Sequence, residues 1–153
     1  MEEFTMEIER KFLIDQLPAD IDSYAYHIIE QAYLCTNPVI RVRKEDDNYY
    51  MTYKGKGLMA REEYNLPLNQ TAYEQLKPKA EGNIIAKKRV LIPYLKYTIE
   101  LDIFAEPFAP LLLAEVEFES EEEALAFTPP AWFGQDVTND RTYHNSNMSQ
   151  RTF

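Results

Sequence analysis

Charged residues alternate with other residues, many of them apolar, in six short segments, and this spacing is the feature that could support chemistry. In a β-strand, residues i, i+2 and i+4 share one face, so each segment would present its charges on one side. Acidic and basic groups that converge in this way suit a polyanion bound together with a divalent metal ion. The alternating positions are Glu7, Glu9 and Lys11; Arg41 and Arg43; Arg61 and Glu63; Lys87 and Arg89; Glu100 and Asp102; and Glu115, Glu117 and Glu119.

The residue types indicate how such a site would work. Mg²⁺ and Mn²⁺ prefer oxygen ligands, and arginine and lysine are the side chains that bind phosphate. The reaction expected from this combination is phosphoryl transfer to water, with metal and guanidinium groups stabilising the developing charge. The expected metal ligands are Glu7, Glu9, Glu115 and Glu117. The expected phosphate-binding residues are Arg41, Arg43, Lys54, Arg61, Lys87 and Arg89.

The charged faces could instead lie on the outside of the protein, as on ordinary solvated strands. Two observations favour an inward orientation. Acids and bases are segregated by strand in four of the six segments, which a surface lacing of salt bridges does not require. The last acidic segment also places its charges among strongly apolar neighbours, in L-L-L-A-E-V-E-F-E (111–119). We therefore expect a barrel with a charged lumen, the inverse of the usual apolar interior.

The elements that would position these residues are mostly strands separated by turn signals. The pattern predicts strands at 4–14, 28–34, 39–44, 49–54, 60–68, 83–92, 95–104 and 111–119, with the 83–104 hairpin turning about Pro93-Tyr94. Short helices are predicted at 71–77 and after Ser120, which is a capping residue followed by acids, and a polar helix at 139–150. This number of strands favours a mainly β fold, a closed eight-stranded antiparallel barrel.

Composition sets further limits. A chain of 153 residues with 45% hydrophobic content fits one domain over 1–153. A net charge of −10 argues against a general nucleic-acid binder. The lone Cys35 excludes an internal disulfide. We expect a cytoplasmic protein without membrane association, because the N-terminus does not read as a signal peptide and no apolar run approaches the roughly 18 residues of a membrane span. The sequence leaves the oligomeric state open, and a homodimer is one of the alternatives.

The opening E-I-E-R-K-F (7–12) resembles the E-x-E-x-K signature of the CYTH family, also called triphosphate tunnel metalloenzymes. Similar motifs follow in order: Q-A-Y-L (31–34), I-R-V-R (40–43), M-T-Y-K (51–54), R-E-E-Y (61–64), K-K-R (87–89), E-L-D-I-F (100–104), L-A-E-V-E-F (113–118) and D-R-T-Y-H-N-S-N (140–147). A single E-x-E-x-K is a weak pattern, but this ordered set covers nearly the whole chain. It looks most like the short bacterial stand-alone members.

The resemblance implies an antiparallel tunnel that acts on triphosphates with Mg²⁺ or Mn²⁺. Carried over residue by residue, it implies metal binding by Glu7, Glu9, Glu115 and Glu117, and triphosphate binding by Lys11, Arg41, Arg43, Lys54, Arg61, Lys87 and Arg89. Glu63, Glu100 and Asp102 would be further tunnel acids that orient basic groups or the attacking water. The tail is similar to the family's C-terminal helix, which plugs one end of the tunnel, so Arg141 and Tyr143 are expected to reach the substrate.

Two positions depart from the family pattern. Asn65 stands where many relatives carry a third acid after R-x-E, so metal affinity or water positioning on that strand is expected to differ. Lys88 stands where a small polar residue is common, and we expect it to point outward.

Three functions are compatible with these features. The leading one is metal-dependent hydrolysis of triphosphates, with inorganic tripolyphosphate preferred, because a mostly ionic tunnel offers little chemistry for recognising a base. The second is an adenylate cyclase that makes cyclic AMP from ATP, which needs an adenosine pocket that the sequence does not identify. The third is a non-catalytic module that binds polyphosphate or a nucleotide. The complete set of acids favours an enzyme over a binding module.

Overall fold

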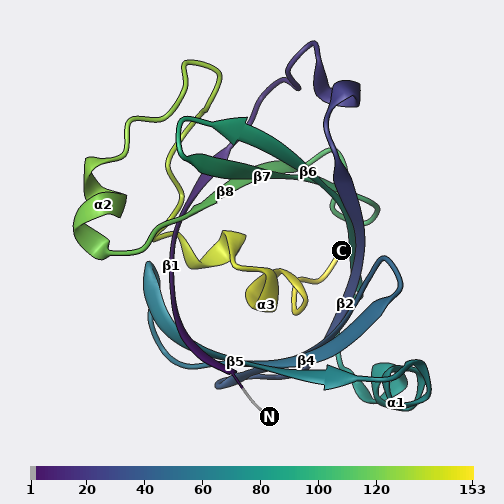
Figure 1. The fold of residues 1–153 in the computed structure, drawn as a ribbon. Coiled ribbons are helices and arrows are strands. Elements are labelled where there is room, and N and C mark those ends of the chain that lie inside the picture. Colours follow the sequence, from purple (N-terminus) through teal and green to yellow (C-terminus); the bar gives the residue numbers. More distant parts are fainter. Residues whose placement is uncertain (1–2) are drawn as a thin grey trace.

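The computed structural model describes residues 3–153, with side chains from Met6 onward. Strands make up most of the fold, with a few short helices beside them (Figure 1). The strands are β1 (Glu3–Leu13), β2 (Tyr26–Thr36), β3 (Val39–Glu45), β4 (Asn48–Lys54), β5 (Ala60–Leu68), β6 (Ile85–Tyr94), β7 (Tyr97–Phe104) and β8 (Leu112–Glu117). The predicted mainly β fold is confirmed, and most strand ends lie within two residues of their predicted positions.

The strands form one closed antiparallel barrel in the order β1-β5-β4-β3-β2-β6-β7-β8. β1 closes the barrel, because its first half pairs with β5 and its second half with β8. Glu7 lies opposite Arg61 in the first pairing, and Glu9 lies opposite Glu117 in the second. Figure 1 looks into the resulting ring. The closed barrel predicted from the alternating segments is therefore correct.

A large part of the apolar core lies outside the barrel wall. Ile8, Leu101 and Val116 alternate with the charged residues of their strands and belong to one buried cluster with Phe118 and Phe127. The α2 helix (Glu121–Ala126) lies on this outer side (Figure 1). Full burial of a side chain of this size contributes about 1.5–3 kcal/mol. The outer layer can therefore stabilise the barrel while the charged positions face inward.

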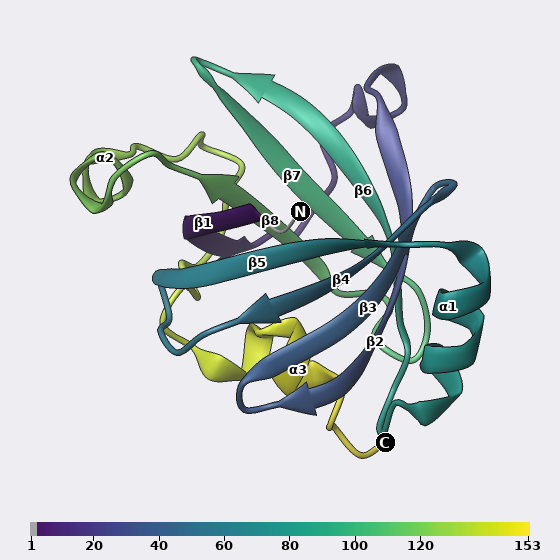
Figure 2. The ribbon, with the colours of Figure 1, turned by 60° about the horizontal axis from the view of Figure 1, so that its bottom comes forward.

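Both predicted helices that follow a strand are confirmed. The α1 helix (Gln70–Leu76) begins after Asn69, whose Oδ1 accepts a hydrogen bond from the backbone N–H of Ala72 at 2.8 Å. The α2 helix begins after Ser120, whose Oγ accepts from the N–H of Glu123 at 3.1 Å. Figure 2 shows α1 and α2 on opposite outer sides of the barrel. The 3₁₀ turns η1 (Ile21–Ser23) and η2 (Lys77–Lys79) were not predicted. None of the helices in residues 3–153 has the length and apolar character needed to span a membrane.

The β6–β7 hairpin turns later than predicted. Tyr94 pairs with Tyr97, so Leu95 and Lys96 form the turn, and Leu95 has a positive φ of 54°. Pro93, which we expected in the turn, lies within β6 opposite Thr98. On the other side of β6, the pairing with β2 reaches no further than Val90. An N–H at position 93 would have no β2 partner there, so a proline is tolerated.

The tail forms two short turns instead of the predicted helix over 139–150. These are the 3₁₀ turn η3 (Arg141–Tyr143) and the single-turn helix α3 (Asn145–Met148). His144 interrupts the helix between them because its backbone is extended, with φ −77° and ψ 131°. Met148 is 1% exposed and anchors α3 in a cluster with Val137. In Figure 1 this segment lies within the ring of strands, so the predicted plug is present in a broken form. We call residues 138–149 the plug.

Candidate active site

The barrel encloses a cavity of about 630 Å³ that is lined mostly by charged and polar side chains. Every strand contributes at least one lining residue. Most of the alternating residues of the sequence meet here, because the period of two directs them to the inner face. The predicted site residues that line the cavity are Glu7, Glu9, Lys11, Arg41, Arg43, Lys54, Arg61, Glu63, Lys87, Arg89, Glu100, Glu115 and Glu117.

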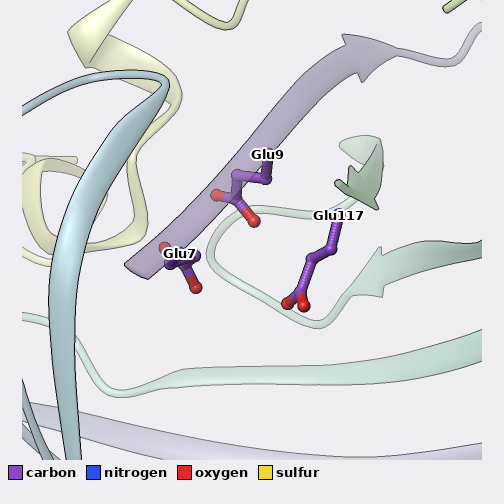
Figure 3. A group of neighbouring side chains, drawn as sticks. All are labelled: Glu7, Glu9 and Glu117. Carbon is purple, nitrogen blue, oxygen red and sulfur yellow. The ribbon is translucent and has the colours of Figure 1, made fainter. Parts of the chain in front are cut away.

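Three carboxylates on one side of the tunnel could hold a metal ion (Figure 3). One oxygen from each of Glu7, Glu9 and Glu117 lies within 4.8 Å of the other two. The β1–β8 register places Glu9 opposite Glu117, and Glu7 shares the inner face of β1 with Glu9. Hard divalent ions take carboxylate oxygens as ligands. We call these three residues the acid group, and its carboxylate oxygens fit a hard divalent cation.

Glu7 is the member of the acid group with direct basic partners. Lys54 Nζ lies 2.9 Å from Glu7 Oε1, and Arg61 Nε lies 3.6 Å from the same oxygen. Burial alone would raise the pKa of Glu7, but Lys54 and the other neighbours outweigh it and lower this pKa to about 2. Glu7 is therefore ionised under ordinary conditions.

The other two members of the acid group have no ion pair with a basic side chain of residues 6–153. Burial, together with the charges of Glu115 and Glu7, raises the pKa of Glu9 well above its usual value. Glu117 is exposed to the lumen but surrounded by protein, and burial and Glu100 raise its pKa to about 7. Burial and neighbouring carboxylate charges are the shared causes, and a bound cation would favour the ionised forms of both groups.

Glu115, the fourth expected metal ligand, faces basic side chains instead. Its Oε2 accepts a hydrogen bond from Arg89 at 2.7 Å, and its Oε1 lies 4.0 Å from Lys11 Nζ. Burial would raise the pKa of Glu115, but Lys11 and Arg89 hold it well below its ordinary value. Glu115 lies outside the acid group, and its role as a metal ligand stays a prediction.

Lys87 and Arg89 are held by a carboxylate behind the tunnel lining. Asp102 is completely buried and does not line the cavity. Its Oδ2 lies 2.7 Å from Lys87 Nζ. Arg89 Nε and Nη2 donate to its two oxygens at 2.7 and 2.9 Å. Burial lowers the pKa of Lys87 to about 8, despite the nearby Asp102. Glu100 Oε2 lies 3.3 Å from Arg89 Nη1. We call Lys87, Arg89 and Asp102 the basic group.

Two further arginines line the tunnel from β3. The Nε of Arg41 is buried and has no hydrogen-bond partner among the described side chains. Its Nη2 donates to Thr52 Oγ1 at 3.2 Å. Burial and the neighbouring Arg43 lower the pKa of Arg41. Arg43 donates to Gln31 Oε1 at 2.8 Å and to the Tyr50 hydroxyl at 3.3 Å. An unpaired buried donor costs about 1–3 kcal/mol, and an anionic oxygen in the cavity would satisfy it.

Asn65 links two parts of the lining through its neutral amide. Its Oδ1 accepts from Thr52 Oγ1 at 2.6 Å, and its Nδ2 donates to Glu63 Oε1 at 2.9 Å. Glu63 Oε2 lies 3.5 Å from Lys54 Nζ. An aspartate at position 65 could not donate to Glu63, so the amide, a departure from the family pattern, orients the acid beside it.

The plug brings residues other than the expected ones into the cavity. Arg141 is exposed, Tyr143 is partly buried against the Met148 cluster, and neither lines the cavity. The backbone carbonyl of Tyr143 accepts a hydrogen bond from Lys11 Nζ at 3.0 Å. Asn145 and Ser146 line the cavity instead.

Sequence reasoning also missed two neutral residues of β2. Gln31 and Tyr33 line the cavity, and Gln31 Nε2 donates to the Tyr33 hydroxyl at 2.9 Å and to Asn145 Oδ1 at 3.2 Å. Their alternation in Q-A-Y-L was the available signal, which a search restricted to charges does not detect. Lys88 does not line the cavity; its Nζ lies 4.3 Å from the ring centroid of the exposed Tyr26, as expected for an outward side chain.

Fold and site together define a closed β-tunnel that gathers carboxylates and cations around an enclosed space. Residues 5–137 match the family model of the CYTH domain, so the chain belongs to the CYTH family. An inorganic triphosphatase from Nitrosomonas europaea is 40% identical over 148 residues, which cover 94% of this chain and 96% of the relative. An inorganic triphosphatase from Acetivibrio thermocellus is 32% identical over 154 residues, covering 96% and 95%. The crystal structure of an inorganic triphosphatase superposes with a TM-score of 0.72 at 37% identity, covering 95% of each chain.

Proposed function

We propose that this protein is a metal-dependent hydrolase of triphosphates whose substrate is inorganic tripolyphosphate. The observation that carries the proposal is one cavity in which three clustered carboxylates lie near many buried cationic groups. The relatives at 40% and 32% identity are both inorganic triphosphatases, which supports the same activity here. A small, highly charged substrate matches this lining, since most of the lining residues are ionic or polar.

Mg²⁺ or Mn²⁺ is the proposed cofactor, and Glu7, Glu9 and Glu117 are its proposed ligands. A bound ion of this kind would neutralise phosphate charge and polarise the phosphorus–oxygen bonds. The close approach of the three carboxylates and the raised pKa values of Glu9 and Glu117 support this assignment. We assign Glu115 to the ion pairs with Arg89 and Lys11.

The tunnel cations would bind the phosphate chain from several sides. The unpaired Nε of Arg41 is one donor that an oxygen of the substrate would satisfy. Asp102 would hold Lys87 and Arg89 in position before the substrate arrives, so little reorganisation is needed in the reaction. The proposed binding residues are Lys11, Arg41, Arg43, Lys54, Arg61, Lys87 and Arg89.

In the proposed reaction a water oxygen attacks a terminal phosphorus, and the bond from that phosphorus to its bridging oxygen breaks. Pyrophosphate leaves, orthophosphate forms, and the proton of the water passes to a tunnel carboxylate. The guanidinium and ammonium groups stabilise charge on the leaving oxygen. Glu63 and Glu100 are the proposed acids beside the reacting water. Arg141 and Tyr143 do not line the cavity, and their contact with the substrate stays a prediction from the sequence. A cytoplasmic location and a homodimer remain predictions from the sequence.

Release of phosphate from tripolyphosphate with Mg²⁺ or Mn²⁺ tests the proposal. Glu7→Ala and Glu117→Ala should each lower kcat/KM about a hundredfold or more, since each removes a proposed ligand. Glu81→Gln is the matched control, because Glu81 is exposed and does not line the tunnel. Undiminished turnover in both alanine variants would rule out the metal site. With ATP, cyclic AMP and pyrophosphate as products would indicate a cyclase, and tripolyphosphate binding without turnover under any divalent metal would indicate a binding module.

A further inference from the structure

The plugged end of the tunnel contains a neutral amide whose orientation is fixed. Asn145, the first residue of α3, lines the cavity. Its Oδ1 accepts hydrogen bonds from Lys87 Nζ at 2.9 Å and from Gln31 Nε2 at 3.2 Å. Gln31 must present its Nε2 because its Oε1 accepts from Arg43. The reverse orientation of Asn145 would set its NH₂ group against two donors, so Oδ1 has to face Lys87 and Gln31.

This orientation leaves the amide nitrogen of Asn145 free for a ligand. The Nδ2 group donates to no group among the described side chains and backbone of residues 3–153, while its residue lines a cavity of buried cations. Lysine and arginine nearby supply positive charge, and the amide adds a donor with fixed direction. An anionic oxygen is the ligand that such a combination fits.

The plug is attached to the barrel on both sides of Asn145. Lys11 Nζ donates to the carbonyl of Tyr143 at 3.0 Å, and Met148 is buried against Val137, so the segment on both sides of Asn145 is attached to the barrel. In Figures 1 and 2 the tail runs past the inner side of the strands near β2. With the plug at this end, a phosphate group in contact with Asn145 would be the terminal group of its chain.

The opposite end of the tunnel has the reverse charge. Glu100 and Glu117 line both the main cavity and a smaller groove of about 280 Å³, to which Glu119 and Glu123 also contribute. Lys96 is the basic residue of this groove and is already paired with Glu123 at 3.1 Å. A phosphate chain that starts at Asn145 and extends beyond the acid group would enter this acidic end and be repelled there.

We propose that Asn145 donates an amide N–H to a terminal phosphate of the substrate, and that the plug and the acidic end together limit the length of the phosphate chain. This inference rests on the proposed function and deepens it by naming the residue that recognises the chain end. Asn145 is a specificity-determining residue in this scheme. The tunnel accepts tripolyphosphate and disfavours a linear chain of four phosphates.

Two substitutions separate the two parts of this role. Asn145→Asp keeps an oxygen for Lys87 and Gln31 but replaces the N–H donor with a charged acceptor, so the affinity for tripolyphosphate should fall about tenfold or more. Asn145→Ala removes the amide and should reduce the preference for three phosphates over four, measured as the ratio of the two kcat/KM values. Asn147→Asp is the control, since Asn147 is exposed on the same helix and does not line the cavity.

Binding is measured by titration calorimetry with tripolyphosphate in EDTA, alongside turnover with Mn²⁺ and thermal unfolding of each variant. The inference is overturned if both Asn145 variants match Asn147→Asp within about twofold in affinity and in chain-length ratio. If Asn145→Ala does not fold, Asn145→Ser replaces it, because a hydroxyl still accepts from Lys87. Failure of the proposed function can be told apart from failure of this inference. In the first case the wild type would release no phosphate with any metal. The EDTA titrations would still decide whether Asn145 binds the anion.

Discussion

The acid group and the basic group of the tunnel are in opposite electrostatic states. In the basic group Lys87 and Arg89 share the buried carboxylate of Asp102 at distances of 2.7–2.9 Å. Among the side chains that the structure describes, Glu7 is the one member of the acid group with ion pairs to basic residues, and the pKa values of Glu9 and Glu117 are raised. The basic group is therefore ordered by the protein itself, whereas the acid group needs an external cation to balance its charge.

The largest effect is expected where the basic group loses its counter-charge. Asp102→Asn keeps the shape of the side chain but leaves Lys87 and Arg89 buried without their shared carboxylate. Breaking a buried ion pair in this way costs about 3–5 kcal/mol, so the free energy of unfolding in urea should fall by that amount. Glu123→Gln, which breaks the exposed pair with Lys96, is the control and should change little. A loss no larger than the control's would show that the basic group does not depend on Asp102.

Removal of a charge from the acid group should not lower stability, in contrast to the loss expected for Asp102→Asn. Glu9→Gln relieves repulsion, so without metal its melting temperature should equal or exceed that of the wild type. Mn²⁺ at a hundred times its Kd should stabilise the wild type by about 2.7 kcal/mol, and this gain should disappear in the variant. Thermal unfolding in EDTA and in Mn²⁺ measures both, with Glu81→Gln, an exposed acid away from the cavity, as the control. An unchanged response to Mn²⁺ in Glu9→Gln would remove Glu9 from the metal site.

A pH profile tests the basic group in the intact tunnel. Burial lowers the pKa of Lys87 from 10.5 to about 8, so its positive charge is lost as the pH rises above 8. The kcat/KM for tripolyphosphate should then fall by up to about tenfold per pH unit. The free energy of unfolding changes in the opposite direction. Between pH 8 and 10.5 the Lys87 side chain holds more protons in the unfolded chain than in the folded one, so its contribution to stability rises over that range. Lys87→Arg stays charged and should lack this decline in kcat/KM; the same decline in both proteins would assign it to another group.

The smallest effect on stability is expected at Asn65, whose amide donates to Glu63, the acid beside Lys54. Asn65→Asp loses the hydrogen bond to Glu63 and sets two carboxylates side by side. We expect a loss of about 1–2 kcal/mol in the free energy of unfolding without metal, with part of it recovered in Mn²⁺. Asn69→Asp is a matched control, because aspartate caps a helix as well as asparagine does. Equal stability of the two variants in EDTA would show that the amide has no orienting role.

The lumen could be predicted from the sequence because a strand has a strict period of two. The register of β1 illustrates this: once Glu7 and Glu9 face inward, Ile8 has to face the outer cluster. Turns and short helices follow less strict rules. Pro93 reads as a turn residue, yet it lies in β6, where its missing N–H is tolerated because the pairing with β2 ends at Val90.

The remaining parts of the site depend on contacts between distant segments. Asn145 becomes a lining residue because the tail folds back beside Lys87 and Gln31, which no local pattern encodes. Glu115 and Glu117 look equivalent in the sequence, yet the first reaches Arg89 and the second joins the acid group. Such differences arise from the position of each residue along the tunnel, so spacing alone cannot distinguish them.

Closure of the barrel by β1 has a consequence for how the protein is made. Residues 3–13 are synthesised before β8, one of their two pairing strands, which follows only after the six other strands. Glu7 and Glu9 therefore stay without Glu117 until β8 has been synthesised. High affinity for a divalent ion should arise only after that point, so metal uptake by nascent chains would report closure of the barrel.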